Sequence, residues 1–515
     1  MNTKKLLLGS LFIGGTLALT RLLFAKPASV NQVSTSAYDG IDTYIEAQMR
    51  RLHIPGASLA IVEGNQIVHQ SGFGRARPGG ETPNPQTPFF IGSLTKSITA
   101  LAVMQLVEAG KVELDAPVRH YLPWFRVADP EASAQITVRH LLNQTSGLPF
   151  LASEIALADV DDSPDAIERG VRALATVKIT HPVGSKCEYS NFNYNVLGLI
   201  VEAASGESYS DYIQQHIFNP LDMRHSYASK DAAKQDSLAV GHRHWFSLPF
   251  PVPNWPVPRG SLPSGQLISC AEDIAHYLIA HLNGGCYDNV QLLSSSSIDE
   301  MHRGVAEFNM FGTSVGKYGM GWFDENMGQV KTFSHGGNVP DFSAFMVLVP
   351  GQKKGMVLLL NADPYGLPFI TEEVGMGVTA LLANQQPAPI KLDFIQWIFR
   401  LLPLIPLLQI AGVVVTLGFL QRWQRDSSSH PSQGSMWRQH TLLPLIPNLS
   451  LSAMLVYLQS SGLIRFLQLF MPDLALVAKI SVVFATIWVS LRTGLMLQFL
   501  RKSRPLNSHM EDTNR

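Results

Sequence analysis

The chain has 515 residues and a formal net charge of −1 at pH 7, so no global basic field marks it as a nucleic-acid-binding protein. Its length is too great for one ordinary hydrophobic core and predicts two or more units. Hydrophobic residues make up 46% of the chain and charged residues only 15%, which argues against a wholly soluble protein and directs the search to membrane segments.

The N-terminal segment has the pattern of an export signal. A pair of lysines precedes an uncharged apolar run at 6–19, and a basic start followed by such a run is typical of secretion signals. The cleavage pattern is poor, because Leu23 stands where a small residue is expected before Ala25. Residues 1–25 are therefore predicted to be either a signal peptide or an N-terminal membrane anchor.

The next unit, from about residue 38 to 388, has the pattern of a globular domain. Its first elements are predicted to be a helix at 41–52, strands at 57–62 and 66–69, a loop at 75–88 and a helix at 97–108. Its last elements are predicted to be a proline-rich loop at 245–263, strands at 343–349 and 355–360, and a helix at 370–382. Strands at both ends with helices between them predict an α/β domain whose sheet is closed by distant parts of the chain.

The first chemical signal is Ser93-Leu94-Thr95-Lys96, at the predicted start of a helix. Residues three apart in a helix lie on one face, so the hydroxyl and the amine are expected to meet. A serine hydroxyl becomes a strong nucleophile when a neighbouring base takes its proton, and a lysine whose pKa is lowered can be that base. Backbone N–H groups at a helix start also stabilise developing negative charge.

The same spacing occurs a second time, at Ser314-Val315-Gly316-Lys317. Residues 312–316 also fit the nucleophile-elbow pattern of α/β-hydrolases, which needs a strand before the serine and a helix after it. The following Tyr318-Gly319-Met320-Gly321-Trp322 is a poor helix start, so we interpret the second match as chance.

Two later motifs support Ser93. Tyr189-Ser190-Asn191 offers a phenol that could shuttle a proton and an amide that could bind a substrate carbonyl. His335-Gly336-Gly337 offers a strand edge where a substrate backbone could lie close. Tyr287-Asp288-Asn289 is a rival for the tyrosine motif, but it lies in a turn-like stretch and its spacing is worse.

After about residue 395 the chain becomes strongly apolar. Three stretches are long enough to cross a bilayer, at about 401–420, 442–463 and 474–491, the last with Lys479 near one end. Three passes place the basic segments at 421–441 and at the C-terminal tail on the cytoplasmic side and leave the globular domain outside. Residues 395–500 are therefore predicted to form an all-α membrane region, and the protein a multi-pass cell-membrane protein.

The three ordered motifs at Ser93, Tyr189 and His335 resemble those of the serine β-lactamase and penicillin-binding protein superfamily. Their order and spacing are similar to the class C β-lactamase, D-alanyl-D-alanine carboxypeptidase and esterase branch. Further agreeing segments are 140–148, 220–223 and 318–322. The resemblance covers about residues 38–385. It implies an antiparallel sheet flanked by helices, with a helical subdomain.

The resemblance also implies roles for individual residues. Ser93 would form an acyl-enzyme, and Lys96 and Tyr189 would share the general acid–base work. Asn191 would hold the substrate amide. The backbone N–H groups of Ser93 and Asn338 would form the oxyanion hole, beside the His335-Gly336-Gly337 motif.

One departure from the family pattern affects specificity. Members that bind penicillin or cell-wall peptides commonly carry a lysine where this chain has His335. A histidine there is expected to be only partly charged near neutral pH. Recognition of a substrate carboxylate would then be weaker, which favours a peptidase or esterase over a true β-lactamase.

Metal and cofactor chemistry is not expected. The chain has 3 cysteines, which are widely spaced and fit neither a metal site nor a disulfide framework, although one bridge stays open. His225, His242 and His244 lack a further ligand at regular spacing. The acyl-enzyme mechanism itself needs no cofactor.

Two functions remain open at this point. The first is a membrane-tethered serine hydrolase that acts outside the cytoplasm on small-molecule, ester, amide or peptide substrates, including peptidoglycan stem peptides. The second is a penicillin-binding receptor or scaffold of the same fold with little turnover. The complete Ser93, Lys96 and Tyr189 set favours the enzyme.

Overall fold

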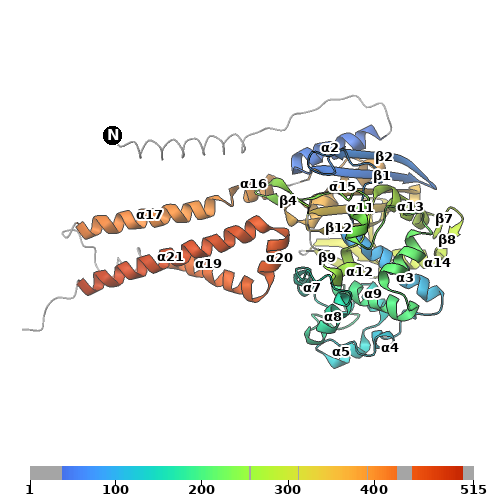
Figure 1. The fold of residues 1–515 in the computed structure, drawn as a ribbon, viewed down its shortest axis with the longest axis horizontal. Helices are drawn as coiled ribbons and strands as arrows, with labels where there is room; N and C mark the ends of the chain where they lie inside the picture. Colours follow the sequence, from blue (N-terminus) through green and yellow to red (C-terminus); the bar gives the residue numbers. More distant parts are fainter. Residues whose placement is uncertain (1–37, 254–256, 311–312, 391–392, 426–442, 503–515) are drawn as a thin grey trace, which may run out of the picture.

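The computed structural model describes residues 38–253, 257–310, 313–390, 393–425 and 443–502. The predicted signal peptide or anchor at 1–25 lies outside these ranges. Figure 1 shows an α/β domain with a separate arm of long helices that projects from one side of it.

Within these ranges, the centre of the domain is an eight-stranded sheet with the order β2-β1-β14-β13-β12-β11-β10-β9. Its strands are β1 (Gly56–Glu63), β2 (Gln66–Gly74), β9 (Ala306–Met310), β10 (Thr313–Tyr318), β11 (Phe323–Met327), β12 (Val330–Val339), β13 (Phe342–Val349) and β14 (Lys354–Leu360). All neighbouring pairs are antiparallel. Because β1 pairs with β14, the two ends of the domain close the sheet, which confirms the α/β prediction and the strands expected at 57–62, 66–69, 343–349 and 355–360.

Helices cover both faces of this sheet. Helices α2 (Asp39–Leu52) and α15 (Pro368–Leu382) pack together on one face, over a core that includes Ile45, Leu358 and Val378. Helix α13 (Ala271–Leu282) contacts β1 and β14 on the other face. The predicted helices at 41–52 and 370–382 are thereby confirmed.

A helical subdomain lies beyond α13, with one continuous hydrophobic core shared with the sheet. Its helices are α3 (Thr95–Glu108), α4 (Val118–Tyr121), α5 (Pro130–Gln135), α6 (Val138–Leu142), α7 (Phe150–Ala156), α8 (Ala166–Arg172), α9 (Asn191–Ser205), α10 (Tyr209–Ile213), α11 (Lys230–Gln235), α12 (Leu262–Gly265) and α14 (Ser295–His302). Helix α3 is buried nearly all round, including its polar first turn, as its central position between sheet and subdomain requires.

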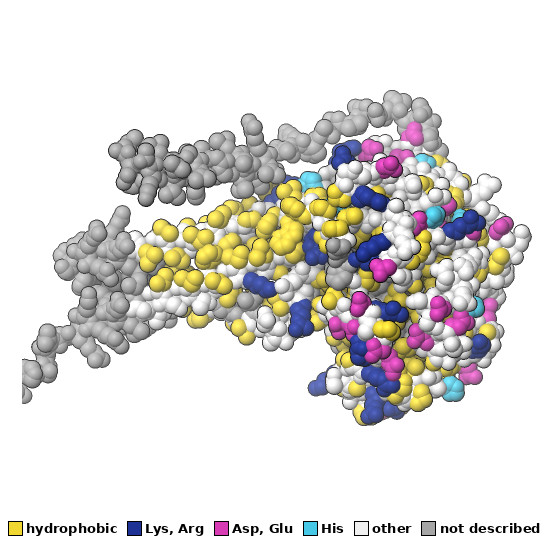
Figure 2. Space-filling model, viewed as in Figure 1, with side chains coloured by type: hydrophobic (Ala, Val, Ile, Leu, Met, Phe, Trp, Pro, Cys, Tyr) yellow, Lys and Arg dark blue, Asp and Glu magenta, His cyan; other side chains and the backbone are white. Residues whose placement is uncertain are grey.

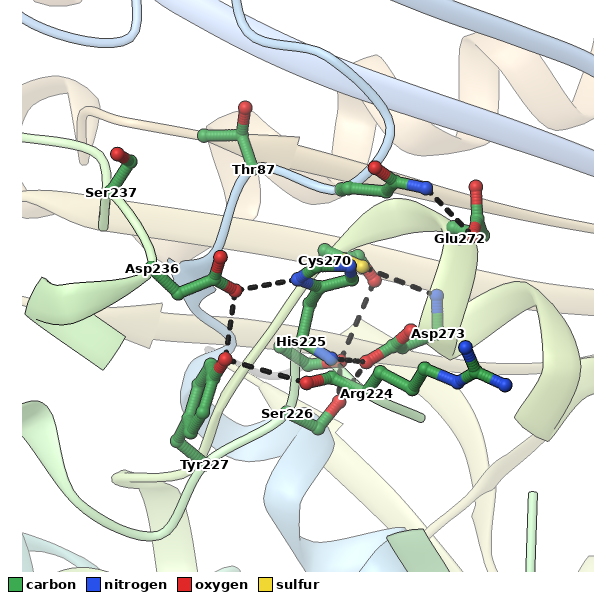
Figure 3. A network of polar contacts seen from close by, with 12 residues as sticks. Thr87, Arg224, His225, Ser226, Tyr227, Asp236, Ser237, Cys270, Glu272 and Asp273 are labelled. Carbon is green, nitrogen blue, oxygen red and sulfur yellow. Dashed lines mark hydrogen bonds and ion pairs between the residues drawn. The ribbon is translucent and has the colours of Figure 1, made fainter. Parts of the chain in front are cut away.

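A polar network fixes the strand pair that precedes the candidate nucleophile. Figure 3 shows His225 and Tyr227 both reaching Asp236, with Nδ1–Oδ2 and Oη–Oδ2 distances of 2.6 and 2.8 Å. Ser226 donates to Asp273 at the start of α13 and contacts Ser269. Ser269 belongs to β6 (Ile268–Ser269), which pairs with β3 (Phe89–Phe90) just before Gly92. His225, one of the three histidines considered as metal ligands, therefore has a structural role.

The loop prediction for 245–263 is wrong in part. Strand β4 (Gly241–Trp245) pairs with β5 (Leu248–Val252), and α12 begins at Leu262. Among the described strands, β5 has β4 on one edge and no partner on the other, so Pro249 and Pro251 can stand in β5 without the loss of a ladder hydrogen bond.

The helical arm consists of α16 (Asp393–Leu401), α17 (Leu404–Arg425), α19 (Leu443–Ser460), α20 (Leu463–Phe470) and α21 (Pro472–Lys502). In the described part of the chain, one helix, Pro472–Gly494, is long and apolar enough to cross a membrane, with a mean hydropathy of 2.1. Helices α16 and α17 together would make a second span, bent by 43°. Length and composition therefore support one or two spans, fewer than the three expected.

The arm contacts the α/β domain at defined points. Asp473, at the start of α21, is buried and accepts a hydrogen bond from the backbone N of Phe246 at 2.9 Å, in the β4–β5 turn. Helix α20 packs against α7, and the turn before it places Gly462 against Ile155, where an added Cβ would lie 3.0 Å from the Ile155 Cγ2. The arm therefore contacts α7, and the candidate site described below lies on the opposite side of this helix.

Candidate active site

Ser93 lies in a short 3₁₀ turn (η1, Gly92–Leu94) that leads directly into α3. Its side chain is partly exposed, whereas Lys96, one turn later, is fully buried. The Lys96 Nζ is 2.9 Å from the Ser93 Oγ. Gly92 has a φ of +54° and lies against β12, where a Cβ would be 2.5 Å from the Asn338 N, so the turn needs a glycine.

The remaining contacts of Lys96 determine where its lone pair points. Its Nζ donates to the Asn191 Oδ1 and to the Ser264 backbone oxygen, each at 2.7 Å. Both partners can only accept, so a neutral amine uses its two protons there and directs its lone pair at the Ser93 hydroxyl. Burial lowers the pKa of Lys96 from 10.5 to about 7, although the charge of Glu154 opposes this shift. The neutral form is therefore accessible near neutral pH.

Tyr189 completes the group. Its hydroxyl faces the Ser93 side chain, a contact that acts to lower the pKa of the phenol, and its ring lies 4.8 Å from the Lys96 Nζ. Burial raises the pKa of Tyr189 well above its ordinary value of 10. The phenol, and not the phenolate, is therefore its resting form.

Glu154 is a site residue that the sequence reasoning missed. It lies on α7, and its Oε1 accepts a hydrogen bond from the Asn191 Nδ2 at 2.8 Å. Burial raises the pKa of its carboxyl, against the attraction of Lys96. A single carboxylate at the end of a short helix carries no sequence motif, and only the fold brings α7 to the start of α9.

Strand β12 carries the His335-Gly336-Gly337 motif. Among the described strands it pairs on both sides as far as Ser334, and from His335 to Val339 it pairs with β13 alone, so no strand lies on its other edge there. The predicted strand edge is thereby located beside η1. Gly337 is required because a Cβ would lie 2.1 Å from the Ile91 backbone oxygen.

The two neighbours of Gly337 face away from η1. A Cβ on Gly336 would lie 2.5 Å from the Glu372 Oε1 on α15. The Asn338 side chain donates to the Asp363 Oδ1 at 2.9 Å, so only its backbone is left for the site.

The expectation that His335 is partly charged near neutral pH is wrong. The ring is buried among Tyr189, Tyr318 and Phe323, and this burial lowers its pKa from 6.5 to about 3. The charge of Lys96 lowers it further. The Nδ1 lies 2.6 Å from the Gly336 backbone oxygen and the Nε2 3.2 Å from the Tyr318 hydroxyl. His335 is therefore a neutral structural neighbour of Tyr189.

The rival motifs lie elsewhere in the fold. Ser314 and Lys317 are exposed on β10. A nucleophile elbow needs a helix after the serine, and here strand β11 follows, so the elbow interpretation stays rejected. The Tyr287-Asp288-Asn289 motif forms the turn between the short strands β7 (Cys286–Tyr287) and β8 (Val290–Gln291). No described contact joins either motif to Ser93.

Among the described residues, no group of three or more His, Cys, Asp and Glu side chains is placed to hold a metal ion. All three cysteines, Cys187, Cys270 and Cys286, lie in the described ranges as free thiols. The disulfide bridge left open by the sequence is therefore not formed in this structure.

Comparison with known proteins gives consistent matches. A family model described as Beta-lactamase matches residues 41–373. Protein flp of Staphylococcus aureus (strain MW2) is 30% identical over 345 residues, 67% of each chain. Penicillin-binding protein 4 of Amycolatopsis lactamdurans is 32% identical over 315 residues, which cover 60% of this chain and 81% of that protein.

Two solved structures show the same fold. An octameric penicillin-binding protein homologue from Pyrococcus abyssi has a TM-score of 0.60 and 29% identity, over 68% of this chain and 78% of the other. The D-amino acid amidase of Ochrobactrum anthropi SV3 has a TM-score of 0.58 and 23% identity, over 68% and 99%. At 23% identity the second match supports a similarity of fold only.

Proposed function

The chain belongs to the beta-lactamase family of serine hydrolases, and from this premise we propose that it forms an acyl-enzyme on Ser93 with peptide, amide or ester substrates. The observation that carries the proposal is the contact of the Ser93 Oγ with both Lys96, at 2.9 Å, and Tyr189. A nucleophile within hydrogen-bond reach of a base, itself held by other groups, is the arrangement that covalent catalysis needs.

The acylation step follows from these contacts. The neutral Lys96 amine takes the Ser93 proton while the Oγ attacks the substrate carbonyl. The leaving group departs with a proton supplied by the Tyr189 phenol, and Lys96 reprotonates the tyrosine. Water then attacks the acyl-enzyme with the same groups acting in reverse, and the acid product and free Ser93 are regenerated.

The oxyanion of each step would be bound by two backbone N–H groups, those of Ser93 and Asn338. Two close approaches support this assignment, those of Gly92 to Asn338 and of Gly337 to Ile91, because they hold η1 and β12 side by side. His335, Gly336 and Gly337 then form the wall of the substrate channel. Asn191, with its amide between Lys96 and Glu154, would contact the acyl half of the substrate.

We further propose that the chain is a multi-pass protein of the cell membrane, with its catalytic domain at about 38–388 on the outer side. Residues 1–25 would act as the export signal or anchor and 395–500 as the membrane region. Apolar side chains cover the arm in Figure 2, whereas acidic and basic side chains are spread over the α/β domain. Large exposed side chains on the arm include Leu408, Val415, Ile446, Val456 and Val483. A surface of this kind fits lipid better than water.

The substrate would be a D-alanyl-D-alanine-type peptide, an amide or an ester rather than a β-lactam. A neutral, buried His335 supplies no charge for a substrate carboxylate, neither that of a penicillin nor the terminal one of a D-alanyl-D-alanine peptide, so the amides and esters are favoured within this class. Peptidoglycan stem peptides stay within the proposed class, because the outer side of the membrane faces the cell wall.

The test uses the full chain in detergent, because α20 supports α7. Wild type, Ser93→Ala and Ser314→Ala are incubated with an aryl ester and a fluorescent penicillin, and covalent label is located by peptide mass spectrometry. We expect label on Ser93 and ester turnover that is lost only in Ser93→Ala. Ser314→Ala is a matched control, because it changes the other Ser-x-x-Lys motif.

Two other outcomes have clear meanings. Label on Ser93 without turnover of any ester or amide would favour the penicillin-binding receptor or scaffold. Equal turnover by wild type and Ser93→Ala would overturn the mechanism.

A further inference from the structure

Asp363 is a buried carboxyl beside the site that the mechanism above does not use. Its Oδ1 accepts a hydrogen bond from the Asn338 Nδ2 at 2.9 Å, and among the described residues its Oδ2 has no hydrogen-bond partner. Burial raises the pKa of this carboxyl well above its ordinary value of 3.8, although the hydrogen bond from Asn338 opposes the shift. A carboxyl that is buried with so few partners costs stability, so its contact with Asn338 calls for a functional reason.

The position of Asn338 supplies that reason. Its backbone N–H is one of the two proposed oxyanion donors, and a Cβ on Gly92 would lie 2.5 Å from its backbone N. Among the described strands, β13 alone pairs with this end of β12. The hydrogen bond to Asp363 therefore gives Asn338 a second attachment, on the face of the strand turned away from η1.

A strained turn follows Asp363 in the chain. This turn, η6 (Pro364–Gly366), has left-handed backbone at two consecutive residues, with φ angles of +62° at Tyr365 and +61° at Gly366. A residue with a Cβ adopts this conformation only where the surrounding structure enforces it. Tyr365 is therefore held in place by its packing and not by its own backbone preference.

Part of that packing comes from the helical arm. The buried ring of Tyr365 contacts His244 of β4 and Phe399 of α16, with ring centroids 5.5 and 5.0 Å apart. A Cβ on Gly366 would lie 2.5 Å from the backbone oxygen of Phe470, at the end of α20. Both helices lie at the domain end of the arm (Figure 1). The arm thus contacts two consecutive residues of the turn that follows Asp363.

We propose that Asp363 is a positioning residue for the oxyanion hole, and that the arm acts on catalysis through it by holding the turn at 364–366. The contacts run from α16 and α20 to this turn, and from Asp363 to Asn338. The seating of the arm on the domain then sets the rate of acylation, in addition to any role as an anchor. This inference rests on the proposed function, because the oxyanion belongs to the reaction at Ser93.

An oxyanion hole acts on the transition state more than on the bound substrate. Negative charge develops on the carbonyl oxygen only as the Ser93 Oγ attacks, so a displaced donor slows acylation and leaves substrate binding nearly unchanged. A loss of global stability has a different signature, because it lowers the melting temperature without slowing the molecules that stay folded. These two signatures separate a positioning residue from a merely structural one.

The experiment follows the pre-steady-state release of p-nitrophenol from p-nitrophenyl acetate, which separates the acylation rate constant from substrate binding. The proteins are full chains in detergent: wild type, Asp363→Ala, Asp363→Asn, Asn338→Ala and Ser133→Ala. Asp363→Asn keeps an oxygen that can accept from Asn338, and Asn338→Ala breaks the same hydrogen bond from its other end. Ser133→Ala is the control, because its buried hydroxyl bonds to Val127 and Asp129 in the helical subdomain.

We expect Asp363→Ala and Asn338→Ala to lower the acylation rate constant by about ten- to a hundredfold at an unchanged substrate dissociation constant, since the donor is displaced but not removed. Asp363→Asn should keep most of the wild-type rate. Ser133→Ala should lower the melting temperature and leave the rate unchanged. Wild-type acylation by Asn338→Ala, or an Asp363→Asn variant as slow as Asp363→Ala, overturns the positioning role.

A double-mutant cycle tests the contribution of the arm. Phe399→Leu removes the ring that contacts Tyr365 and should slow acylation by about three- to tenfold. In the Asp363→Ala background the same substitution should have no further effect, because the link to Asn338 is already broken. Independent effects of the two substitutions, which multiply in the double variant, overturn the coupling through Asp363.

Ser93→Ala separates this inference from the function on which it rests. Release of p-nitrophenol that depends on Ser93, but is unaffected by the variants at Asp363 and Asn338, overturns the inference alone. No release that depends on Ser93 overturns the proposed function and the inference with it.

Discussion

The chain contains the Ser-x-x-Lys spacing at Ser93 and again at Ser314, and the two copies differ in every physical respect. At Ser93 the motif spans a helix start, where three residues rise only about 5 Å, and the two side chains meet at 2.9 Å. At Ser314 it lies on strand β10, where three residues cover about 10 Å. There the serine donates to Glu307 and both motif residues are exposed. The motif specifies only that the two residues are three positions apart, and the secondary structure determines whether their side chains come into contact.

The nucleophile gives the largest expected difference between the two copies. Ser93→Ala should lower aryl-ester hydrolysis by about 10³-fold or more, because it removes the atom that forms the acyl-enzyme. Ser314→Ala should stay within about twofold, as an exposed strand residue. Steady-state kinetics on the full chains checks both. A comparable loss in Ser314→Ala would show that the second copy takes part in catalysis.

The lysines should follow with a smaller effect. Lys96→Met is expected to cost about 10²- to 10⁴-fold in kcat, the range for loss of a general base. Lys317→Met should leave the rate unchanged, since its side chain lies in solvent. Thermal unfolding of Lys96→Met must be measured alongside, and a folded variant with full activity would remove Lys96 from the mechanism.

A third prediction concerns the enclosure of Ser93 by β12. Gly337→Ala places a Cβ 2.1 Å from the Ile91 backbone oxygen, so either the strand or η1 must shift. We expect a loss of about 1–3 kcal/mol in the free energy of unfolding. Gly351→Ala meets nothing within 4 Å and should be neutral. Denaturant unfolding measures the stability of both variants. Equal stabilities would show that β12 and η1 pack more loosely than described.

The smallest effect is a shift in the pH profile. Lys96 acts as a base only when neutral, so activity should fall as the pH drops through its pKa of about 7. Glu154 raises that pKa, and its replacement by glutamine should therefore move the acid limb to lower pH, by about one unit. The profile is measured with p-nitrophenyl acetate, which has no amine. A shift towards higher pH would contradict the described attraction.

Much of this site could be predicted from the sequence, because its groups sit in ordered motifs. Ser93, Lys96, Tyr189 and Asn191 are brought together as expected, and their chemistry follows from residue type and helical spacing. The strands that close the sheet were predictable for a similar reason, since their apolar runs are long and bounded by turn residues.

What could not be predicted depends on burial between distant segments. The charge state of His335 cannot be read from the sequence, because the aromatic rings that desolvate it come from Tyr189, Tyr318 and Phe323, which are distant in the chain. Glu154 was missed because its neighbours belong to α3 and α9. The sequence predicts a loop in place of the β4–β5 hairpin because alternating prolines disfavour strands except at an unpaired edge.

The contact between α7 and the turn before α20 has a consequence for the chain as a whole. On one side α7 presents Glu154 to the site, and on the other Ile155 rests on Gly462. Helices that span a bilayer change their tilt when its thickness changes, and a tilt of the proposed membrane arm would move the support of α7. Lipid thickness would then change the position of Glu154 in the site. A fragment cut between the two parts would lack the support that the arm gives to α7.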